Sequence, residues 1–298
     1  MQINIIKHRK TWLVLSALMI VAGIVALSIW QLKLGIDYTG GTLLEVSYQK
    51  DRPSTQEITS VLAAENIKDA EIKFSGDTGV IMRFKTIDED THQNVLAKLK
   101  KQDANLLEKS FESIGPVIGH ELKSKSLLAI ALALILIMAY ITFVFRRVSF
   151  PVPSWQYGAT AIIALFHDLI FVLGIFAVLG VFRGVEITSS FIPAFLTVLG
   201  FSVHDTIVVF DRVRENLLKY KGAFAEIVSK SLNETLVRSI NTSLTVMLVL
   251  AAIYVFGGES LKTFSLALLL GIGVGTYSSL FFASPLLVAW HEWSARRK

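Results

Sequence analysis

Long runs without charged residues constrain this chain more than any other feature of its sequence. A helix needs about 20 consecutive apolar residues to cross a membrane, because the hydrocarbon core is about 30 Å thick and each residue rises about 1.5 Å. The chain of 298 residues is 53% hydrophobic and only 18% charged, whereas an ordinary soluble domain is about 25% charged. These values exclude a disordered chain and argue strongly against a soluble enzyme.

Six runs are long enough to span a membrane. Four carry no charge, at residues 11–32, 126–145, 239–258 and 263–290. The other two are interrupted only by His167 with Asp168 and by His204 with Asp205. We therefore expect an α-helical membrane protein with spans at residues 11–32, 125–145, 157–180, 187–210, 238–257 and 263–290.

The distribution of Lys and Arg predicts the orientation of these spans, because loops on the cytoplasmic side are enriched in both residues. With the N-terminus inside, the inner segments carry 13 Lys and Arg residues, and the two short outer loops carry only Arg183 and Lys262. The net charge of +5 is thus explained by membrane orientation rather than by nucleic-acid binding. The inner residues are Lys7, Arg9, Lys10, Arg146, Arg147, Arg212, Arg214, Lys219, Lys221, Lys230, Arg296, Arg297 and Lys298.

This orientation fixes the expected domain order. Both termini, residues 1–10 and 291–298, are expected in the cytoplasm, and residues 33–124 are expected outside the membrane. Residues 211–237 are expected as a cytoplasmic amphipathic segment. All five Trp residues lie at or near the predicted ends of spans, as the aromatic belts of membrane proteins require.

The segment 33–124 has the pattern of a small α+β domain. Residues 42–48 alternate apolar and polar side chains, and residues 54–57 form a capping box that opens a helix. Two further strands, a second helix and a last strand complete the order βαββαβ, which is typical of a ferredoxin-like fold. That fold hosts many functions. The segment contains no phosphate loop, metal-ligand cluster or catalytic triad.

Ionisable residues inside the spans are the best candidates for function. A charge at the centre of a bilayer costs at least about 2.5 kcal/mol, so such groups face a helix bundle and often serve ion pathways. Asp205 and Arg238 are both predicted in the cytoplasmic half, where they can pair and carry a proton. A simpler alternative is that the two residues only fix neighbouring helices. Asp168 is a weaker candidate, with His167 and His204 as auxiliary groups, and His167 with Asp168 can instead be a local pair.

Several sequence blocks resemble the SecD/SecF family of the bacterial Sec translocase. GIDYTGGT at residues 35–42, with Asp37, Gly40 and Gly41, resembles a family signature. GPVIGHEL at 115–122 and ALFHD at 164–168 are similar to further family stretches, and GFSVHDTIVVFDR at 200–212 is the strongest match. The blocks NETLVR at 233–238 and YSSLF at 277–281 follow the family pattern in the same order. Many members have Asn at the position of His204.

The resemblance implies a role, partners and a location. It implies a bacterial cytoplasmic (inner) membrane protein that pairs with SecD, is related to the RND exporters and works with the SecYEG channel. YajC, YidC and an unfolded preprotein are further implied partners. It also implies coupling to a flow of H⁺ or Na⁺ through Asp205 and Arg238, without a cofactor, a metal or an enzymatic reaction.

Two other functions remain open from the sequence. The chain can be half of an RND-type exporter of small molecules, or a membrane scaffold that transports nothing. The external segment of about ninety residues is small beside the porter domains of RND exporters, which favours the protein-export function. The scaffold hypothesis predicts that the charges inside the membrane tolerate substitution.

Overall fold

The computed structural model describes residues 4–49, 52–147 and 151–296. The chain forms two compact units. The first, here called the helical unit, comprises Met1–Lys33 and Leu128–Lys298, and the second, here called the sheet unit, comprises Leu34–Leu127. Arg297 and Lys298 of the expected cytoplasmic tail lie outside the described residues, as does the side chain of Arg147.

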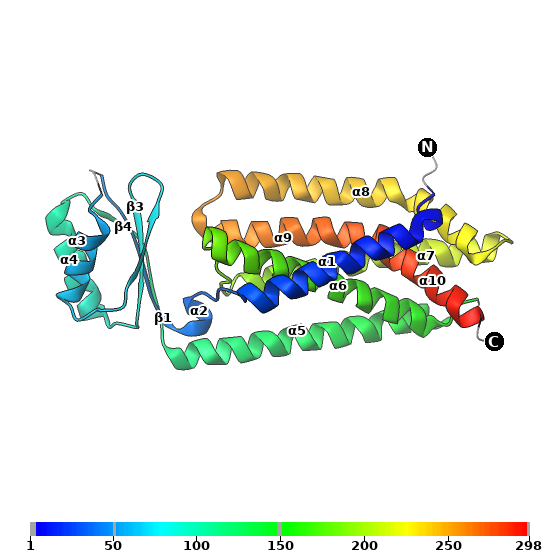
Figure 1. Ribbon diagram of the computed structural model, residues 1–298, viewed down its shortest axis with the longest axis horizontal. Helices are drawn as coiled ribbons and strands as arrows, with labels where there is room; N and C mark the ends of the chain where they lie inside the picture. Colours follow the sequence, from blue (N-terminus) through cyan, green and yellow to red (C-terminus); the bar gives the residue numbers. More distant parts are fainter. Residues whose placement is uncertain (1–3, 50–51, 148–150, 297–298) are drawn as a thin grey trace. The chain divides into compact units, whose positions relative to one another are not determined.

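The described part of the chain contains six helical segments that are long and apolar enough to cross a membrane. Each contains most or all of one of the runs predicted from the sequence, so the prediction of six long apolar helices is confirmed. The segments are α1 (Arg9–Trp30), α5 (Pro116–Val144), α6 (Ser154–Arg183), α7 (Phe191–Lys219), α8 (Phe224–Phe256) and a last span built from α9 (Glu259–Ser278), the π-helical η3 (Ser279–Ala283) and α10 (Ser284–Ala295) (Figure 1). Short 3₁₀ turns lie at Ile6–His8 and Phe145–Arg147.

Residues 211–237, expected as an amphipathic segment, comprise the end of α7, a turn and the start of α8. α7 continues through Lys219, and α8 begins at Phe224 and runs without a break into the fifth span. α8 contains neither Pro nor Gly, so nothing in its sequence stops a helix at the membrane boundary. The chain turns between the two helices at Tyr220–Ala223 instead.

The core of the helical unit lies between α6, α7 and the last span. These three bury half or more of their most apolar stretch, whereas α1 and α8 bury 17% of theirs. α1 packs on α6 through small residues, because a Cβ atom added to Gly174 would lie only 2.6 Å from the Cα of Gly23. Close packing through small residues is the usual way in which membrane helices associate.

The sheet unit contains a four-stranded antiparallel sheet with two helices on one of its faces (Figure 1). The strand order is β2-β3-β1-β4. Alternate residues of the strands pack against both helices, and Leu44, Val80, Met82, Ile58 and Leu99 are fully buried in this core. The elements are α2 (Ile36–Thr39), β1 (Gly41–Ser47), α3 (Thr55–Ala63), β2 (Glu71–Ser75), β3 (Gly79–Phe84), α4 (Glu89–Gln102) and β4 (Leu107–Ile114).

Both helices of the sheet unit begin at side-chain caps. Ser54 and Glu57 form the capping box predicted for α3, with the Glu57 backbone nitrogen donating to Ser54 Oγ and the Ser54 backbone nitrogen donating to Glu57 Oε2 at 2.7 Å. The Thr91 backbone nitrogen donates to Asp88 Oδ1 at 2.9 Å and starts α4. These bonds satisfy backbone donors that have no partner within the helix, and they lower the pKa of both carboxyls.

Candidate functional site

Asp168 lies in the middle of α6 and is 1% exposed. Its Oδ2 accepts hydrogen bonds from Ser202 Oγ of α7 at 2.6 Å and from Ser278 Oγ of α9 at 2.8 Å. Its Oδ1 lies 2.9 Å from Nδ1 of His167, which is fully buried against the ring of Phe282. Asp168 therefore ties three helices together through short contacts on both of its carboxylate oxygens.

Asp205 lies on α7, one helical turn after Ser202, and is 3% exposed. The hydroxyl groups of Ser243 on α8 and Thr276 on α9 lie 3.4 Å and 3.3 Å from its Oδ2. These contacts are at the long end of the hydrogen-bond range, whereas those of Asp168 are short. The hydroxyl oxygens of Ser243 and Thr276 lie 2.6 Å apart. The two buried carboxylates therefore have neighbours of the same kind but very different bond lengths.

One turn of the last span serves both carboxylates. Thr276 contacts Asp205, and Ser278 contacts Asp168. At the next residue the π-helical segment begins, where Ser279 Oγ lies 2.8 Å from Thr206 Oγ1 and donates to the Ser202 carbonyl. π-helical turns often occur at functional sites. Through Thr276 and Ser278, α9 therefore contacts both buried carboxylates.

The ion pair expected between Asp205 and Arg238 is not present among the described residues. Arg238 is exposed on α8, while Ser239 and Ser243 of the same helix are buried and Ser243 faces Asp205. Successive residues of a helix point about 100° apart. Because Ser239 and Ser243 take the inward face, Arg238 lies on the outer side of the helix. The residue numbers alone do not fix this rotation, so the sequence could not show which residue of α8 lies beside Asp205.

The two histidines beside the buried aspartates differ in exposure. His204 precedes Asp205 and is exposed, as the 100° step between neighbours predicts. His167 contacts Asp168, so the local pair considered from the sequence is present.

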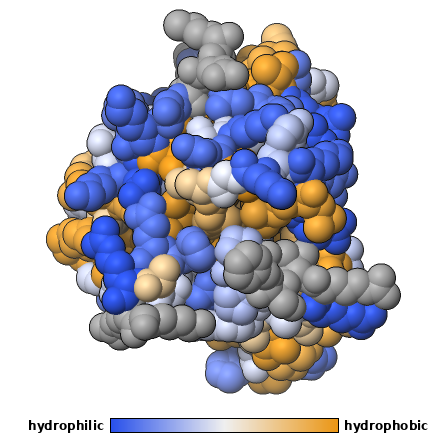
Figure 2. Space-filling view, turned by 90° about the vertical axis from the view of Figure 1, so that its right-hand side faces the viewer, coloured by the Kyte–Doolittle hydropathy of each residue, from blue (hydrophilic) through white to orange (hydrophobic). Residues whose placement is uncertain are grey.

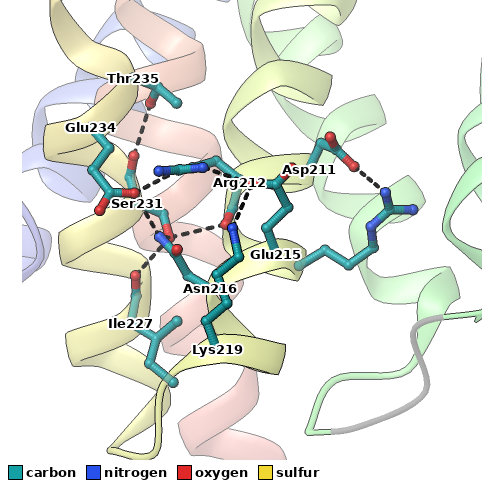
Figure 3. Close-up of polar contacts among 10 residues, drawn as sticks. Asp211, Arg212, Glu215, Asn216, Lys219, Ile227, Ser231, Glu234 and Thr235 are labelled. Carbon is teal, nitrogen blue, oxygen red and sulfur yellow. Dashed lines mark hydrogen bonds and ion pairs between the residues drawn. The ribbon is translucent and has the colours of Figure 1, made fainter.

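A separate polar network joins the end of α7 to the start of α8 (Figure 3). Arg212 donates to Glu215 of its own helix and to Glu234 of α8, each at 2.6 Å. Asn216 donates to Ser231 Oγ at 2.9 Å and to Glu234 Oε2 at 2.8 Å. Hydrophilic residues gather on this face of the molecule, with hydrophobic residues between them (Figure 2). The network holds the turn between α7 and α8.

Comparisons with known proteins identify the family. The family described as "Protein export membrane protein SecD/SecF, C-terminal" matches residues 94–293, and "SecD/SecF GG Motif" matches residues 28–51. The chain is 46% identical to protein translocase subunit SecF of Thermobaculum terrenum, over 97% of this chain and 94% of that protein. The chain belongs to the SecF family of protein translocase subunits. A second SecF, from Anaerolinea thermophila, is 38% identical over 98% of this chain and 96% of that protein.

A solved structure is also similar. The crystal structure of SecDF, a translocon-associated membrane protein from Thermus thermophilus, matches with a TM-score of 0.84 and 29% identity. The match covers 98% of this chain but only 39% of that chain. A second SecDF structure, in a super-membrane-facing form, matches with a TM-score of 0.71. SecF membership thus explains the multi-pass helical architecture and places the chain in protein export.

The SecF family signature lies in the sheet unit, whereas both buried carboxylates belong to the helical unit. Asp37 is buried in α2, and Gly40 and Gly41 connect α2 to β1 with φ angles of +73° and +129°. A Cβ on Gly40 would lie 2.8 Å from Pro116 Cα, and one on Gly41 would lie 2.9 Å from the Phe84 carbonyl oxygen. Both glycines are needed because the backbone passes too close to its neighbours for any side chain.

Sequence reasoning missed the hydroxyl residues of the site. Ser202, Ser243, Thr276 and Ser278 occur in otherwise apolar helices. The sequence signal that could have identified them is their position one helical turn or less from other polar residues. This signal is weak, because Ser and Thr are common in membrane helices and often donate hydrogen bonds to their own backbone. Only the packing of α6, α7, α8 and α9 shows which hydroxyls reach a carboxylate.

Proposed function

We propose that this chain is the SecF-type subunit of a Sec export complex that, together with SecD, uses the proton motive force to move preproteins across the bacterial cytoplasmic membrane. The observation that carries the proposal is Asp205, a buried carboxylate in the centre of the bundle with only long hydrogen bonds. The hydroxyl groups beside Asp205 hold its carboxylate less tightly than those beside Asp168, which has short contacts on both oxygens. We therefore assign proton exchange to Asp205 and leave Asp168 as the weaker candidate.

The position of SecD is proposed from α8. Arg238, Asn241, Thr242 and Thr245 are all exposed and follow the spacing i, i+3, i+4 and i+7 of one helix face. A polar face of this kind is unfavourable against lipid, where a central charge costs at least about 2.5 kcal/mol. We propose that SecD helices cover this face and that SecD supplies the charge partner of Arg238. The larger SecDF chain, of which the present chain covers 39%, supports a partner of this type.

The remaining arrangement is proposed from the sequence pattern and the fold. The order β1-α3-β2-β3-α4-β4 and the antiparallel strand order support a ferredoxin-like domain between the first two spans, outside the membrane. The Lys and Arg distribution supports a cytoplasmic position for both termini. SecYEG, YajC, YidC and the unfolded preprotein are partners that the family implies, and the complex is related to the RND exporters. Its activity is transport rather than an enzymatic reaction.

Copurification in mild detergent tests the proposed assembly. SecD and the SecYEG channel are expected to elute with the tagged chain. Cysteines placed at Thr245 on the polar α8 face are expected to cross-link to SecD, whereas cysteines at Leu261, away from that face, serve as the control. Absence of a SecD-type chain from the complex, or equal cross-linking from both positions, would contradict the assembly.

Vesicles that contain the assembled complex test the activity. After ATP-driven translocation has stopped, release of a preprotein is expected to continue only while a proton gradient is maintained. Collapse of the gradient with a proton ionophore is expected to stop release. Arg238→Met is expected to stop it as well, because the proposed partner group on SecD then has no opposite charge to pair with. Release that ignores both changes would support a scaffold that takes no part in transport.

A further inference from the structure

The hydroxyl groups of Ser243 and Thr276, beside Asp205, each have one hydrogen to donate but several oxygen atoms within hydrogen-bond distance. Each lies within reach of Oδ2 of Asp205, at 3.4 Å for Ser243 and 3.3 Å for Thr276. Each also lies 2.9 Å from a carbonyl oxygen of its own helix, that of Ser239 or Ile272. The two hydroxyl oxygens are themselves 2.6 Å apart. Both hydroxyls therefore have a choice between the carboxylate, the backbone and each other.

Five contacts at hydrogen-bond distance have to be served by two hydroxyl hydrogens, because each hydroxyl donates once and accepts up to twice. When Asp205 is ionised, one or both hydroxyls can turn toward it. When Asp205 is protonated, its own O–H becomes a third hydrogen. It can then donate to a hydroxyl oxygen while Ser243 and Thr276 turn toward their backbone carbonyls. Only O–H bonds rotate, and the oxygen atoms keep their places.

We propose that Ser243 and Thr276 are positioning residues that let Asp205 gain and lose a proton while remaining hydrogen-bonded in both states. In the binding step an O–H bond forms between the incoming proton and Asp205 Oδ2. The hydroxyl that donated to this oxygen turns to its own backbone carbonyl and accepts the new hydrogen. Release reverses each change. The inference rests on the proposed function and specifies the coupling ion as a proton.

The neighbouring carboxylate supplies a contrast within the same bundle. Asp168 accepts bonds of 2.6 Å and 2.8 Å from Ser202 and Ser278. The Ser278 hydroxyl also lies 3.1 Å from the Gly275 carbonyl oxygen, whereas the Ser202 hydroxyl has no second acceptor among its described contacts. Asp205 thus differs from Asp168 in that both of its hydroxyl neighbours have a second acceptor on the backbone and lie within reach of each other. The ionisable side chains nearest to the level of Asp205 along the sequences of the helices packed around it include His167 and Asp168 on α6, His204 on α7, Arg238 on α8 and Tyr277 on α9.

Substitution of the two hydroxyls in the full complex tests the inference. Thr276→Val keeps the shape of the side chain, and Ser243→Ala removes only the hydroxyl. In reconstituted vesicles, each variant is expected to lower proton flux per assembled complex, and the double variant by about tenfold or more, as the loss of hydrogen bonds to a buried charge predicts. Thr276→Ser restores a hydroxyl and is expected to restore flux. Ser265→Ala, which removes a buried hydroxyl of α9 bonded only to its own helix, is the control and is expected to change nothing.

Infrared difference spectra separate this role from simple packing. The carboxyl C=O band that Asp205→Asn removes is expected to shift to higher frequency in Thr276→Val, because the protonated carboxyl loses a partner. Normal flux and an unshifted band in both single variants would overturn the inference. So would a loss of assembled complex with normal flux in what remains. If Asp205→Asn itself keeps full proton flux, the proposed function fails, whereas loss of flux in Asp205→Asn with normal flux in the double hydroxyl variant contradicts only the hydroxyl role.

Discussion

At the scale of single residues, the two buried aspartates differ in what they hold together. Asp168 accepts from Ser202 and Ser278 and contacts His167, so α6, α7 and α9 converge on one carboxylate. Leaving a buried donor without its acceptor costs about 1–3 kcal/mol. A residue that joins three helices in this way is expected to affect stability before it affects transport.

We predict that Asp168→Asn lowers the thermal stability of the assembled complex by about 1–3 kcal/mol, because the amide nitrogen or the loss of charge weakens at least one of its three contacts. Proton flux per surviving complex is expected to stay within a factor of about two. Thermal unfolding in detergent and flux in vesicles measure the two effects. Asp211→Asn, which changes a surface carboxylate paired with Arg214, is the control. Full stability with lost flux would instead make Asp168 an ion carrier.

The helix caps of the sheet unit predict how its stability depends on pH. Hydrogen bonds from Ser54 to Glu57, and from Thr91 to Asp88, lower the pKa of these carboxyls below the ordinary values of 4.5 and 3.8. A carboxyl whose pKa is lower in the folded state contributes stability above its unfolded pKa and loses it as the pH falls through the folded pKa. Thermal melts of the protein are therefore expected to show weakening of this unit below about pH 4.5. The dependence is expected to be shallower in Asp88→Asn, whose amide oxygen still caps α4 without titrating. An unchanged slope would exclude Asp88 as a contributor.

At the scale of elements, α1 and α6 meet at the glycines Gly23 and Gly174. We predict that Gly174→Ala separates the two helices and destabilises the helical unit by about 1–3 kcal/mol, the usual cost of overpacking. The new Cβ would lie 2.6 Å from Gly23 Cα, a backbone atom that has no rotamer to change. Gly200→Ala is the control, since a Cβ there meets nothing within 4 Å. Equal melting temperatures for the two variants would contradict the close crossing.

The positions of the helices and strands along the chain were far more predictable from the sequence than the rotation of each helix about its own axis. Uncharged runs locate the spans because a charge inside a membrane is costly, and alternation with a capping box locates the strands and α3. Charge marks the membrane surface but does not stop a helix, so α7 and α8 both continue beyond the apolar runs from which their spans were predicted. Whether Arg238 or Ser243 faces Asp205 depends on the rotation of α8 about its axis, which is set by side-chain packing with α7 and α9.

At the scale of the whole molecule, the absence of native cysteine makes the topology open to direct labelling. We predict that a cysteine at Ser75, in β2, reacts with an impermeant thiol reagent added to intact cells. A cysteine at Lys221, between α7 and α8, is expected to react only after the cells are opened. The asymmetry of Lys and Arg between the two sides is the physical reason. Labelling of Lys221→Cys from outside would reverse the proposed orientation.

The whole complex provides the measurement that tests the central claim, that Asp205 couples proton movement to preprotein export. Asp205→Asn keeps the volume of the side chain and removes only its ability to ionise. In vesicles that hold the assembled complex, proton flux and gradient-dependent preprotein release are measured together and normalised to the amount of complex. The account predicts normal assembly with both activities abolished in Asp205→Asn. Full gradient-dependent release from Asp205→Asn vesicles would contradict it and would leave Asp205 as a structural contact between helices.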